Sequence, residues 1–359
     1  MNFRKFLYIL LTILALTSIF SNCSKSKYPE GLFAELYTNK GLIVLNLEFE
    51  KTPLATANFV GLSEGTIDNT AFPAGTPFFD GTVFGRVVPG HVIQAGGPKD
   101  GNSRGCGYTF PNEIDPELSH GKAGMLGVAN GGPHTNANQW YITLDDRSYL
   151  DGDYIVFGNV IEGIEVVFSV VQDDYVDSVK IVRIGSKAES FKPVTETFNQ
   201  MIETAKETVR IAEENKKKEE AAIIAENWPE AVTLDNGMKY IILNEGSGSK
   251  PSDGSVLTVQ YEGQFLNGTK FYSTAENGAP AYSDKAEPFE YTVGQTSVNR
   301  GFDEALMDMK KGEKRLIILP PELAYRQRGF YGRDVEGQKR FHISPNTTVV
   351  YTIELLDIK

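Results

Sequence analysis

The chain has 359 residues, which exceeds the usual size of one compact domain and predicts two folded domains. Hydrophobic residues make up 41% and charged residues 23%, with 21 Phe and 16 Tyr, and this composition excludes general disorder. The 35 Lys and Arg against 47 Asp and Glu give a net charge of −12, which opposes phosphate binding, so no nucleic-acid partner is expected. The 2 cysteines and 4 histidines show no ligand spacing, and neither a disulfide framework, a metal site nor a cofactor is expected.

The N-terminus has the pattern of an export signal. Basic residues precede an apolar run, Phe6 to Phe20, that is shorter than the roughly 20 residues of a membrane-spanning helix. Cys23 follows, and this order is similar to a bacterial lipoprotein signal, although Asn22 stands where Gly, Ala or Ser is usual. We therefore expect a signal peptide over residues 1–22, a lipid on Cys23, a tether over 23–31, and export to the bacterial cell envelope, periplasmic or at the outer membrane. Ordinary cleavage, an uncleaved anchor and a silent thiol are the alternatives.

Strand signals and breakers alternate in the first half of the chain. Residues 41–50 (GLIVLNLEFE) have the period of a half-buried strand. Thr52 is a good N-cap with Pro53 at the first helical position, which predicts a helix up to the breaker Gly65. From there to Gly158, short apolar runs are separated by Gly and Pro, as in an all-β barrel or sandwich with long loops.

Residues 194–227 are rich in Glu, Lys and Ala and contain no Gly. Apolar side chains recur there on one helical stripe: Phe198, Met201, Ile202, Ala205, Val209 and Ala212. Pro229 would end the helix, because proline disfavours helix in the residue before it. We expect a helix that links two domains. It could be a spacer or a partner-binding groove, but an amphipathic helix that packs on its own domains is favoured.

The C-terminal part returns to strand patterns. Strands are expected over residues 238–243, 256–265, 269–271, 314–319 and 349–358, with a hairpin turn at Asn267-Gly268. One helix carries Phe302, Ala305, Leu306 and Met309 on one face and should end at Gly312. These elements predict one sheet folded over one helix.

A first set of motifs surrounds Arg86 and Gln94, which stand eight residues apart on predicted strands. An even spacing lets both side chains face the same way if the Pro-Gly turn between them keeps the register. With GMLGVAN (124–130), NQWYI (138–142) and YLDG (149–152), this segment resembles the cyclophilin family of peptidyl-prolyl isomerases over about residues 32–186. The resemblance implies a closed β-barrel that isomerises X-Pro peptide bonds.

The resemblance also assigns roles to single residues. Arg86 would be the catalytic arginine, while Gln94 and Asn130 would hold the substrate backbone. The groove and its proline pocket would be formed by His91, Val92, Ala129, Tyr141, Tyr149, Leu150 and Tyr154.

Several of these positions depart from the family. Relatives usually have Phe, Met and Phe where this chain has His91, Val92 and Tyr141, so a smaller and more polar pocket is expected. Tyr149 and Tyr154 replace the common Trp and His, and weak cyclosporin binding is expected because the drug usually relies on that Trp.

An arginine suffices for this chemistry because no covalent bond breaks. The X-Pro bond has a rotational barrier of about 18–20 kcal/mol, and twisting it localises a lone pair on the prolyl nitrogen. An always-charged guanidinium can donate to that nitrogen more strongly than to the planar amide. A surface ion pair is the alternative for Arg86 taken alone. His91 is expected to be a wall residue, since the reaction needs no proton transfer.

A second set of motifs occupies the C-terminal part: VQYEG (259–263), GTKF (268–271), RGF (300–302), KGE (311–313) and PELAY (321–325). Together with the closing strand, they resemble the FKBP family, an unrelated class of prolyl isomerase, over about residues 231–359. The resemblance implies an antiparallel sheet wrapped on one helix, with an aromatic cage for proline. The cage and its rim would consist of Tyr261, Phe271, Phe289, Val298, Asn299, Phe302, Tyr325, Ile343 and Tyr351.

Two positions of this cage depart from the family. Tyr272 stands where Asp is usual, and Phe302 where a Trp floor is usual. The first change removes a charge near the substrate carbonyl, which leaves turnover and FK506-type binding open. Nearby, residues 326–340 (RQRGFYGRDVEGQKR) form a basic insertion that could grip acidic clients, although a solvated, mobile loop is favoured.

The sequence as a whole predicts a mainly β protein with a few helices. Its expected parts are a cyclophilin-like domain over 32–186, a helical linker over 187–229 and an FKBP-like domain over 230–359. The predicted function is prolyl cis-trans isomerisation and assistance to the folding of proline-containing exported polypeptides. The alternative is a holdase or scaffold that binds proline segments without turnover, above all through the C-terminal domain.

Overall fold

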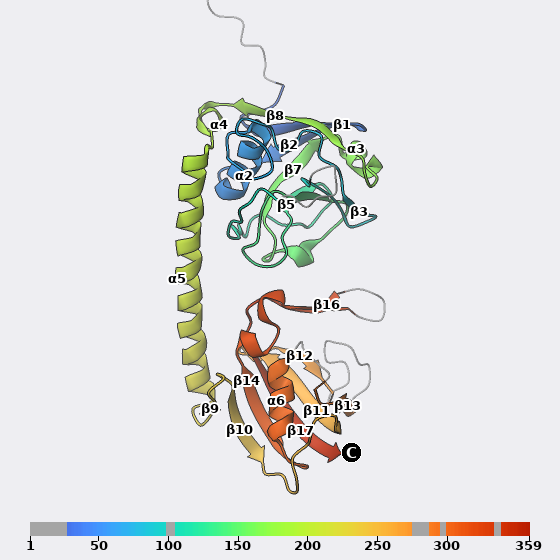
Figure 1. Ribbon diagram of the computed structural model, residues 1–359, viewed down its shortest axis with the longest axis vertical. Helices are drawn as coiled ribbons and strands as arrows, with labels where there is room; N and C mark the ends of the chain where they lie inside the picture. Colours follow the sequence, from blue (N-terminus) through green and yellow to red (C-terminus); the bar gives the residue numbers. More distant parts are fainter. Residues whose placement is uncertain (1–26, 98–104, 275–286, 295–298, 334–338) are drawn as a thin grey trace, which may run out of the picture.

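The computed structural model describes residues 27–97, 105–274, 287–294, 299–333 and 339–359. The predicted signal peptide, Cys23 and Val298 lie outside these ranges. Two β-rich units follow one another along the long axis of the molecule, and one long helix runs beside them (Figure 1). The expectation of a mainly β protein with a few helices is confirmed. None of the helices in the described ranges combines the length and the apolar run that crossing a membrane requires.

The first unit is built on an eight-stranded antiparallel sheet. Its spatial order is β3-β4-β6-β5-β7-β2-β1-β8. The strands are β1 (Gly31–Thr38), β2 (Gly41–Leu47), β3 (Arg86–Val88), β4 (Val92–Ala95), β5 (Met125–Val128), β6 (Trp140–Thr143), β7 (Val156–Glu162) and β8 (Val176–Ile184). The strand pairing runs as an open path, and Val83 forms single bridges to Gly97 beside β4 and Tyr175 beside β8. Closure of a full barrel therefore stays a prediction.

Helix α2 (Pro53–Glu64) is almost entirely buried and ends at Gly65, whose φ of 69° is the left-handed conformation that glycine adopts readily. Thr52 is the N-cap residue, as predicted, but its hydroxyl donates to the carbonyl of Glu48 and accepts no hydrogen bond from the first turn of the helix. Glu113 takes that role from a distant loop: its Oε2 accepts the N–H groups of Leu54 (2.9 Å) and Ala55 (3.1 Å). Burial raises the pKa of Glu113 to about 7, and an oxygen of either protonation state can accept these bonds.

Short helical elements complete this unit: η1 (Ser148–Leu150), α3 (Ile164–Ser169) and α4 (Ser186–Ser190). The free thiol of Cys106 is buried in the core between the sheet and α2. Burial also raises its pKa, so the side chain packs as a small apolar group.

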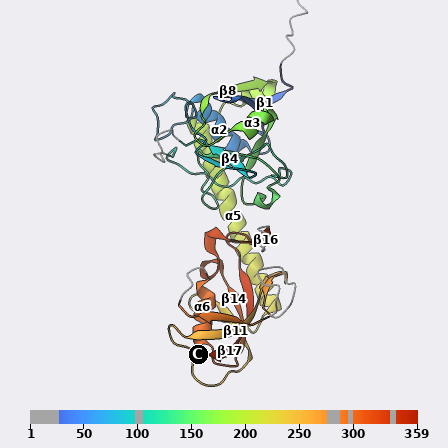
Figure 2. The same cartoon turned by 90° about the vertical axis from the view of Figure 1, so that its right-hand side faces the viewer.

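The predicted linker helix is α5 (Thr195–Asn227). Its first turns belong to the first unit, because Phe198 and Ile202 are buried in that core and Met201 and Ala205 pack against it. Farther along, most of its side chains are exposed, its middle passes the gap between the two units, and its last turns lie beside the second unit (Figures 1 and 2). The favoured interpretation of a helix packed on its own domains therefore holds for the first turns, while hydrogen bonds of Lys216 and Glu220 join the second half to the second unit.

The second unit is a seven-stranded antiparallel sheet in the order β12-β11-β17-β14-β10-β9, with β13 also paired to β11. Its strands are β9 (Val232–Thr233), β10 (Lys239–Asn244), β11 (Val256–Phe265), β12 (Lys270–Ser273), β13 (Phe289–Thr292), β14 (Lys314–Leu319) and β17 (Val349–Ile358). Helix α6 (Arg300–Asp308) packs on it and ends before the predicted Gly312, because Met309 turns extended with its side chain fully buried.

Two short helical turns, η2 (Pro321–Leu323) and η3 (Arg326–Arg328), lead into the basic insertion. The insertion is not simply the loop that was favoured: β15 (Phe330–Arg333) and β16 (Lys339–Ile343) pair as an antiparallel hairpin. This hairpin arm extends from the second unit at the end that faces the first (Figure 1).

Candidate active sites

The first site begins with a cross-strand pair. Arg86 on β3 and Gln94 on β4 are direct register partners, so their side chains leave the same face of the sheet. The guanidinium Nη1 of Arg86 donates to Oε1 of Gln94 at 3.4 Å, and Nε2 of Gln94 donates to Oε1 of Gln139 at 2.7 Å. The predicted common orientation of Arg86 and Gln94 is confirmed. The exposed arginine stands at the mouth of a cavity.

This cavity has a volume of about 210 Å³. Its walls are Arg86, His91, Val92, Gln94, Ala129, Asn130, Tyr141, Leu150 and Tyr154, all of them residues that the sequence had singled out. Tyr149 stands beside the wall and stacks on His91 with ring centroids 6.4 Å apart and an interplanar angle of 15°. The structure thus gathers the predicted set from strands β3, β4 and β6, the helical turn η1 and the adjoining loops into one pocket.

Amide side chains hold the loop that carries Asn130. The Asn130 Nδ2 donates to Asn136 Oδ1 at 3.2 Å, and Asn136 in turn donates to the carbonyl of Phe110 at 3.1 Å. The backbone N–H of Ala129 donates to the carbonyl of Gln139 at 2.9 Å. Because Asn136 is fully buried, this network fixes the rim of the pocket.

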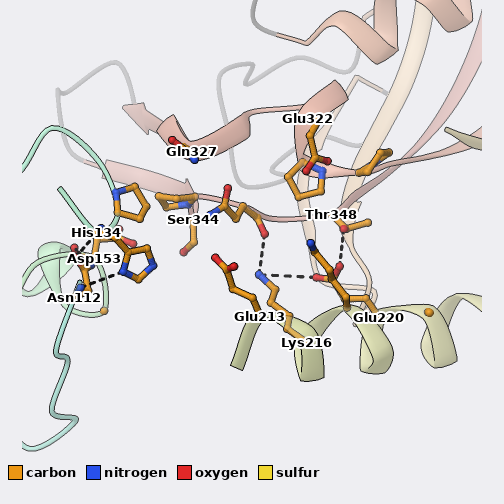
Figure 3. Close-up of a pocket in the computed structure, with 18 of the residues that line it drawn as sticks. Asn112, His134, Asp153, Glu213, Lys216, Glu220, Glu322, Gln327, Ser344 and Thr348 are labelled. Atoms are coloured by element: carbon orange, nitrogen blue, oxygen red, sulfur yellow. Dashed lines mark hydrogen bonds and ion pairs between the residues drawn. The ribbon is translucent and has the colours of Figure 1, made fainter. Parts of the chain in front are cut away.

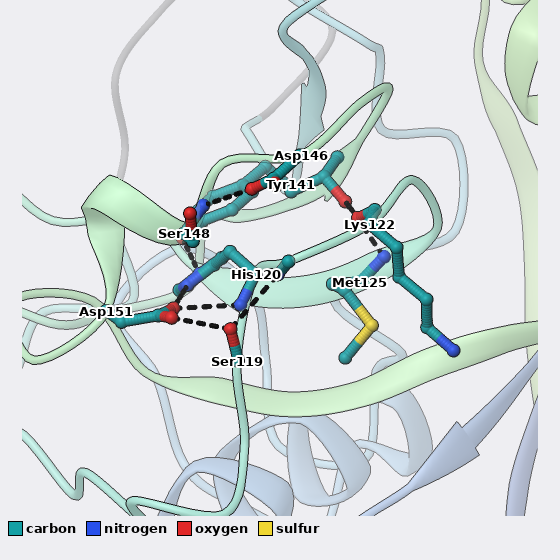
Figure 4. A network of polar contacts seen from close by, with 10 residues as sticks. Ser119, His120, Lys122, Met125, Tyr141, Asp146, Ser148 and Asp151 are labelled. Carbon is teal, nitrogen blue, oxygen red and sulfur yellow. Dashed lines mark hydrogen bonds and ion pairs between the residues drawn. The ribbon is translucent and has the colours of Figure 1, made fainter. Parts of the chain in front are cut away.

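Tyr141 of the pocket is supported by a chain of polar contacts that runs through the buried His120 to Asp151 (Figure 4). The His120 ring is fully buried, with Nδ1 at 2.7 Å from Asp151 Oδ1 and Nε2 at 2.7 Å from the hydroxyl of Tyr141. Burial lowers the pKa of His120 and raises that of Tyr141, so both are neutral at pH 7. The neutral ring then donates from Nδ1 to Asp151 and accepts the Tyr141 proton at Nε2. The pocket tyrosine is held in place by this chain.

The second site is a cluster of aromatic rings over the sheet of the second unit. Tyr261 lies at its centre, with ring centroids 5.0 Å from Phe302, 6.2 Å from Tyr351 and 6.2 Å from Phe289. Phe271 contacts Tyr351 at 5.8 Å, and Ile343 is fully buried in the same core. Every described member of the predicted cage is therefore in or beside one cluster.

One edge of this cluster is polar. Asn299 caps helix α6 and donates from Nδ2 to the hydroxyl of Tyr351 at 3.0 Å, while the hydroxyls of Tyr351 and Tyr325 are 2.8 Å apart. Burial raises the pKa of Tyr351 far above its usual value, so its hydroxyl stays protonated. These bonds orient the hydroxyl groups of Tyr325 and Tyr351 at this edge of the cluster.

Family comparisons agree with this geometry. Residues 33–186 match the model of cyclophilin type peptidyl-prolyl cis-trans isomerases, and residues 247–356 match that of FKBP-type peptidyl-prolyl cis-trans isomerases. Peptidyl-prolyl cis-trans isomerase A of Mycobacterium tuberculosis is 41% identical over 133 residues, which are 36% of this chain and 73% of that protein. The chain belongs to the cyclophilin-type peptidyl-prolyl cis-trans isomerase family.

Other relatives cover the same part. Human peptidyl-prolyl cis-trans isomerase-like 1 is 36% identical over 165 residues, 43% of this chain and 91% of that protein. A crystal structure of a Cryptosporidium parvum cyclophilin type peptidyl-prolyl cis-trans isomerase covers 43% of this chain and 98% of its own, at 26% identity and a TM-score of 0.37. The protein is thus a peptidyl-prolyl isomerase with a cyclophilin-type domain followed by an FKBP-type domain.

Sequence reasoning missed two supports of the cyclophilin-type pocket, Gln139 and His120. Gln139 lies inside the quoted NQWYI motif, next to Trp140 on β6, and could have been found there. His120 gave no local signal, because it meets Tyr141 only through the tertiary fold. In the FKBP-type domain, Tyr291 and Phe330 were missed: Tyr291 contacts Phe302 at 5.9 Å, and Phe330 contacts Tyr325 at 5.4 Å.

The structure shows what Tyr272 contacts at the position where the FKBP family usually has Asp. Its ring stacks on Tyr261 with centroids 4.8 Å apart and an interplanar angle of 21°. The residue is thus a wall of the aromatic cluster, and no carboxylate stands at this position.

Proposed function

We propose that both domains bind proline-containing polypeptides and that the cyclophilin-type pocket isomerises their X-Pro bonds through Arg86. The observation that carries this proposal is the cross-strand pair of Arg86 and Gln94 at one cavity with Asn130. Gln94 and Asn130 offer amide groups to the substrate backbone, while His91, Val92, Tyr141 and Leu150 enclose the proline ring.

Arg86 acts on the twisted amide. Its guanidinium has five N–H donors, and the bond to Gln94 takes one of them. As the X-Pro bond rotates, the prolyl nitrogen gains a lone pair, and a second N–H of Arg86 donates to it. The bond is stronger in the twisted state than in the planar amide, so it lowers the barrier.

The test is a prolyl cis-trans assay on a short peptide with the full chain. Arg86→Ala should lower kcat/KM of the cyclophilin-type site by about 10²–10³-fold, the loss expected for one transition-state donor. The rate that remains above the uncatalysed reaction measures the FKBP-type site, and adding Tyr325→Ala should remove it. Wild-type activity in the single variant Arg86→Ala would refute the assignment of catalysis to Arg86.

A holdase is the second candidate for the FKBP-type domain, and Tyr272 favours it. The tyrosine stacks on Tyr261 where a carboxylate would otherwise act near the substrate carbonyl, so proline binding without fast turnover is expected there. The Arg86→Ala variant separates the candidates, because the isomerisation that remains in it comes from the FKBP-type domain. A holdase there leaves little isomerisation but still suppresses aggregation of an unfolded proline-rich client, whereas a second isomerase leaves substantial isomerisation.

We also propose export and a lipid on Cys23, on the strength of the N-terminal sequence pattern. Clients would then be exported polypeptides. Labelling of growing bacteria with a palmitate analogue should mark the wild type and leave Cys23→Ser unmarked.

Weak cyclosporin binding is proposed on the basis of Tyr149, and titration of the drug against isomerase activity tests it; FK506-type binding stays open.

A further inference from the structure

Residues of both candidate active sites line a common cavity between the domains. A cavity of about 780 Å³ has one wall from the cyclophilin-type domain, including Asn130 and Tyr154, and another from the FKBP-type domain, including Tyr325 and Phe330. Asn130 and Tyr154 also line the pocket of Arg86, and Tyr325 is hydrogen-bonded to the cage residue Tyr351. Each active site therefore shares a wall with this cavity.

A second cavity of about 890 Å³ continues the first (Figure 3). The two share Pro133 and Asp153 from the cyclophilin-type domain and Gln327 and Pro345 from the FKBP-type domain. Side chains of α5 form its third wall, among them Lys216. The cavities together form one cleft, which α5 borders along one side.

Helix α5 connects the two domains along this cleft. Its N-terminal part is anchored by Phe198 in the cyclophilin-type core. Its C-terminal part is bonded to the segment before β17: Lys216 Nζ donates to the carbonyl of Asn346 at 2.8 Å, and the buried Thr348 donates to Glu220 Oε2 at 2.8 Å. One helix is thus joined to both of the domains that line the cleft.

The lining of the cleft suits an extended polypeptide. Proline rings and Phe330 give apolar surface, and the amide side chains of Asn130 and Gln327 can bond to a backbone. Arg326 and Arg328 are exposed on the FKBP-type wall and favour an acidic side chain in the segment that crosses it.

We propose that one client segment binds both sites at once, with one proline at the Arg86 pocket, a second at the aromatic cage, and an acidic stretch between them in the cleft. This inference rests on the proposed function that each site binds proline. Joining two sites that a single chain can span raises affinity by about 10²–10⁴-fold, and the gain vanishes when the spacer is too short and declines when it is too long.

The test measures peptide affinity by calorimetry with the full chain. A series of peptides carries two X-Pro units joined by acidic spacers of increasing length, and matched peptides have Ala in place of one proline or the other. We expect an optimum spacer at which the two-proline peptide binds at least tenfold more tightly than either single-proline peptide. Affinity that never exceeds the single-proline values by more than threefold at any spacer length would overturn the proposal.

Two variants test whether the gain in affinity of the two-proline peptide depends on the cleft. Gln327→Trp puts a large ring at an exposed position where the two cavities meet, and it should reduce the ratio of two-proline to single-proline affinity at least fivefold. Gln200→Trp makes the same change on an exposed position of α5 near the cyclophilin-type domain and should keep the ratio. An undiminished ratio in Gln327→Trp would refute the route through the cleft. Single-proline turnover, assayed on the wild type, tests the proposed function separately.

Discussion

The hydroxyl of Tyr141 should contribute measurably to the stability of the cyclophilin-type domain. Tyr141→Phe keeps the ring but removes the proton donor 2.7 Å from His120 Nε2. Both side chains are almost fully buried, and water cannot replace the lost partner without opening the core. A buried acceptor left without its donor costs about 1–3 kcal/mol, so the free energy of unfolding should fall by that amount.

Denaturation with urea, followed by tryptophan fluorescence, measures this loss. Trp140 is buried in the cyclophilin-type core, and the background substitution Trp228→Phe removes the other tryptophan. Tyr154→Phe is the matched control, since it deletes a hydroxyl from a half-buried tyrosine of the same pocket and should change stability by less than about 0.5 kcal/mol. If Tyr141→Phe lost no more stability than this control, the hydrogen-bond chain through His120 would not support the pocket.

Three further outcomes follow from the same structure. Burial lowers the pKa of His120 below 6.5, so at falling pH the unfolded chain takes up a proton on this residue before the folded chain does. The free energy of unfolding should therefore fall as the pH drops below about 6.5. In denaturation measured at a series of pH values, His120→Asn should weaken this pH dependence. Glu113→Ala removes the acceptor at the start of α2 and should lower the free energy of unfolding by about 1–2 kcal/mol. Glu113→Gln keeps an acceptor oxygen and should retain most of the stability. Equal losses in urea denaturation would contradict the capping role. Phe198→Ala should destabilise the cyclophilin-type domain by about 3–5 kcal/mol and leave unfolding of the FKBP-type domain in place, as scanning calorimetry can show; an unchanged first transition would mean that α5 is not part of that core.

The local sequence pattern was enough to predict several of the longer helices and strands. Strands β11, β14 and β17 occupy the predicted residues, and α5 begins within one residue of its predicted start. These elements carry their signal in a short stretch, as alternation along a strand or a stripe along a helix. The members of both sites were also found from the sequence, because their motifs recur in a recognisable order.

The sequence alone therefore determined that this chain has two prolyl isomerase domains of different families, joined by a long helix, and it named the residues that line the cavity of Arg86. Only the tertiary structure decided how these parts are supported and face one another. Glu113 caps a helix 59 residues away, and His120 reaches Tyr141 across 21 residues. Likewise, Thr348 meets Glu220 from 128 residues away. Contacts of this kind cannot be predicted from the spacing of residues along the chain. They form because the tertiary fold brings distant segments together, and no periodic pattern in the sequence indicates them.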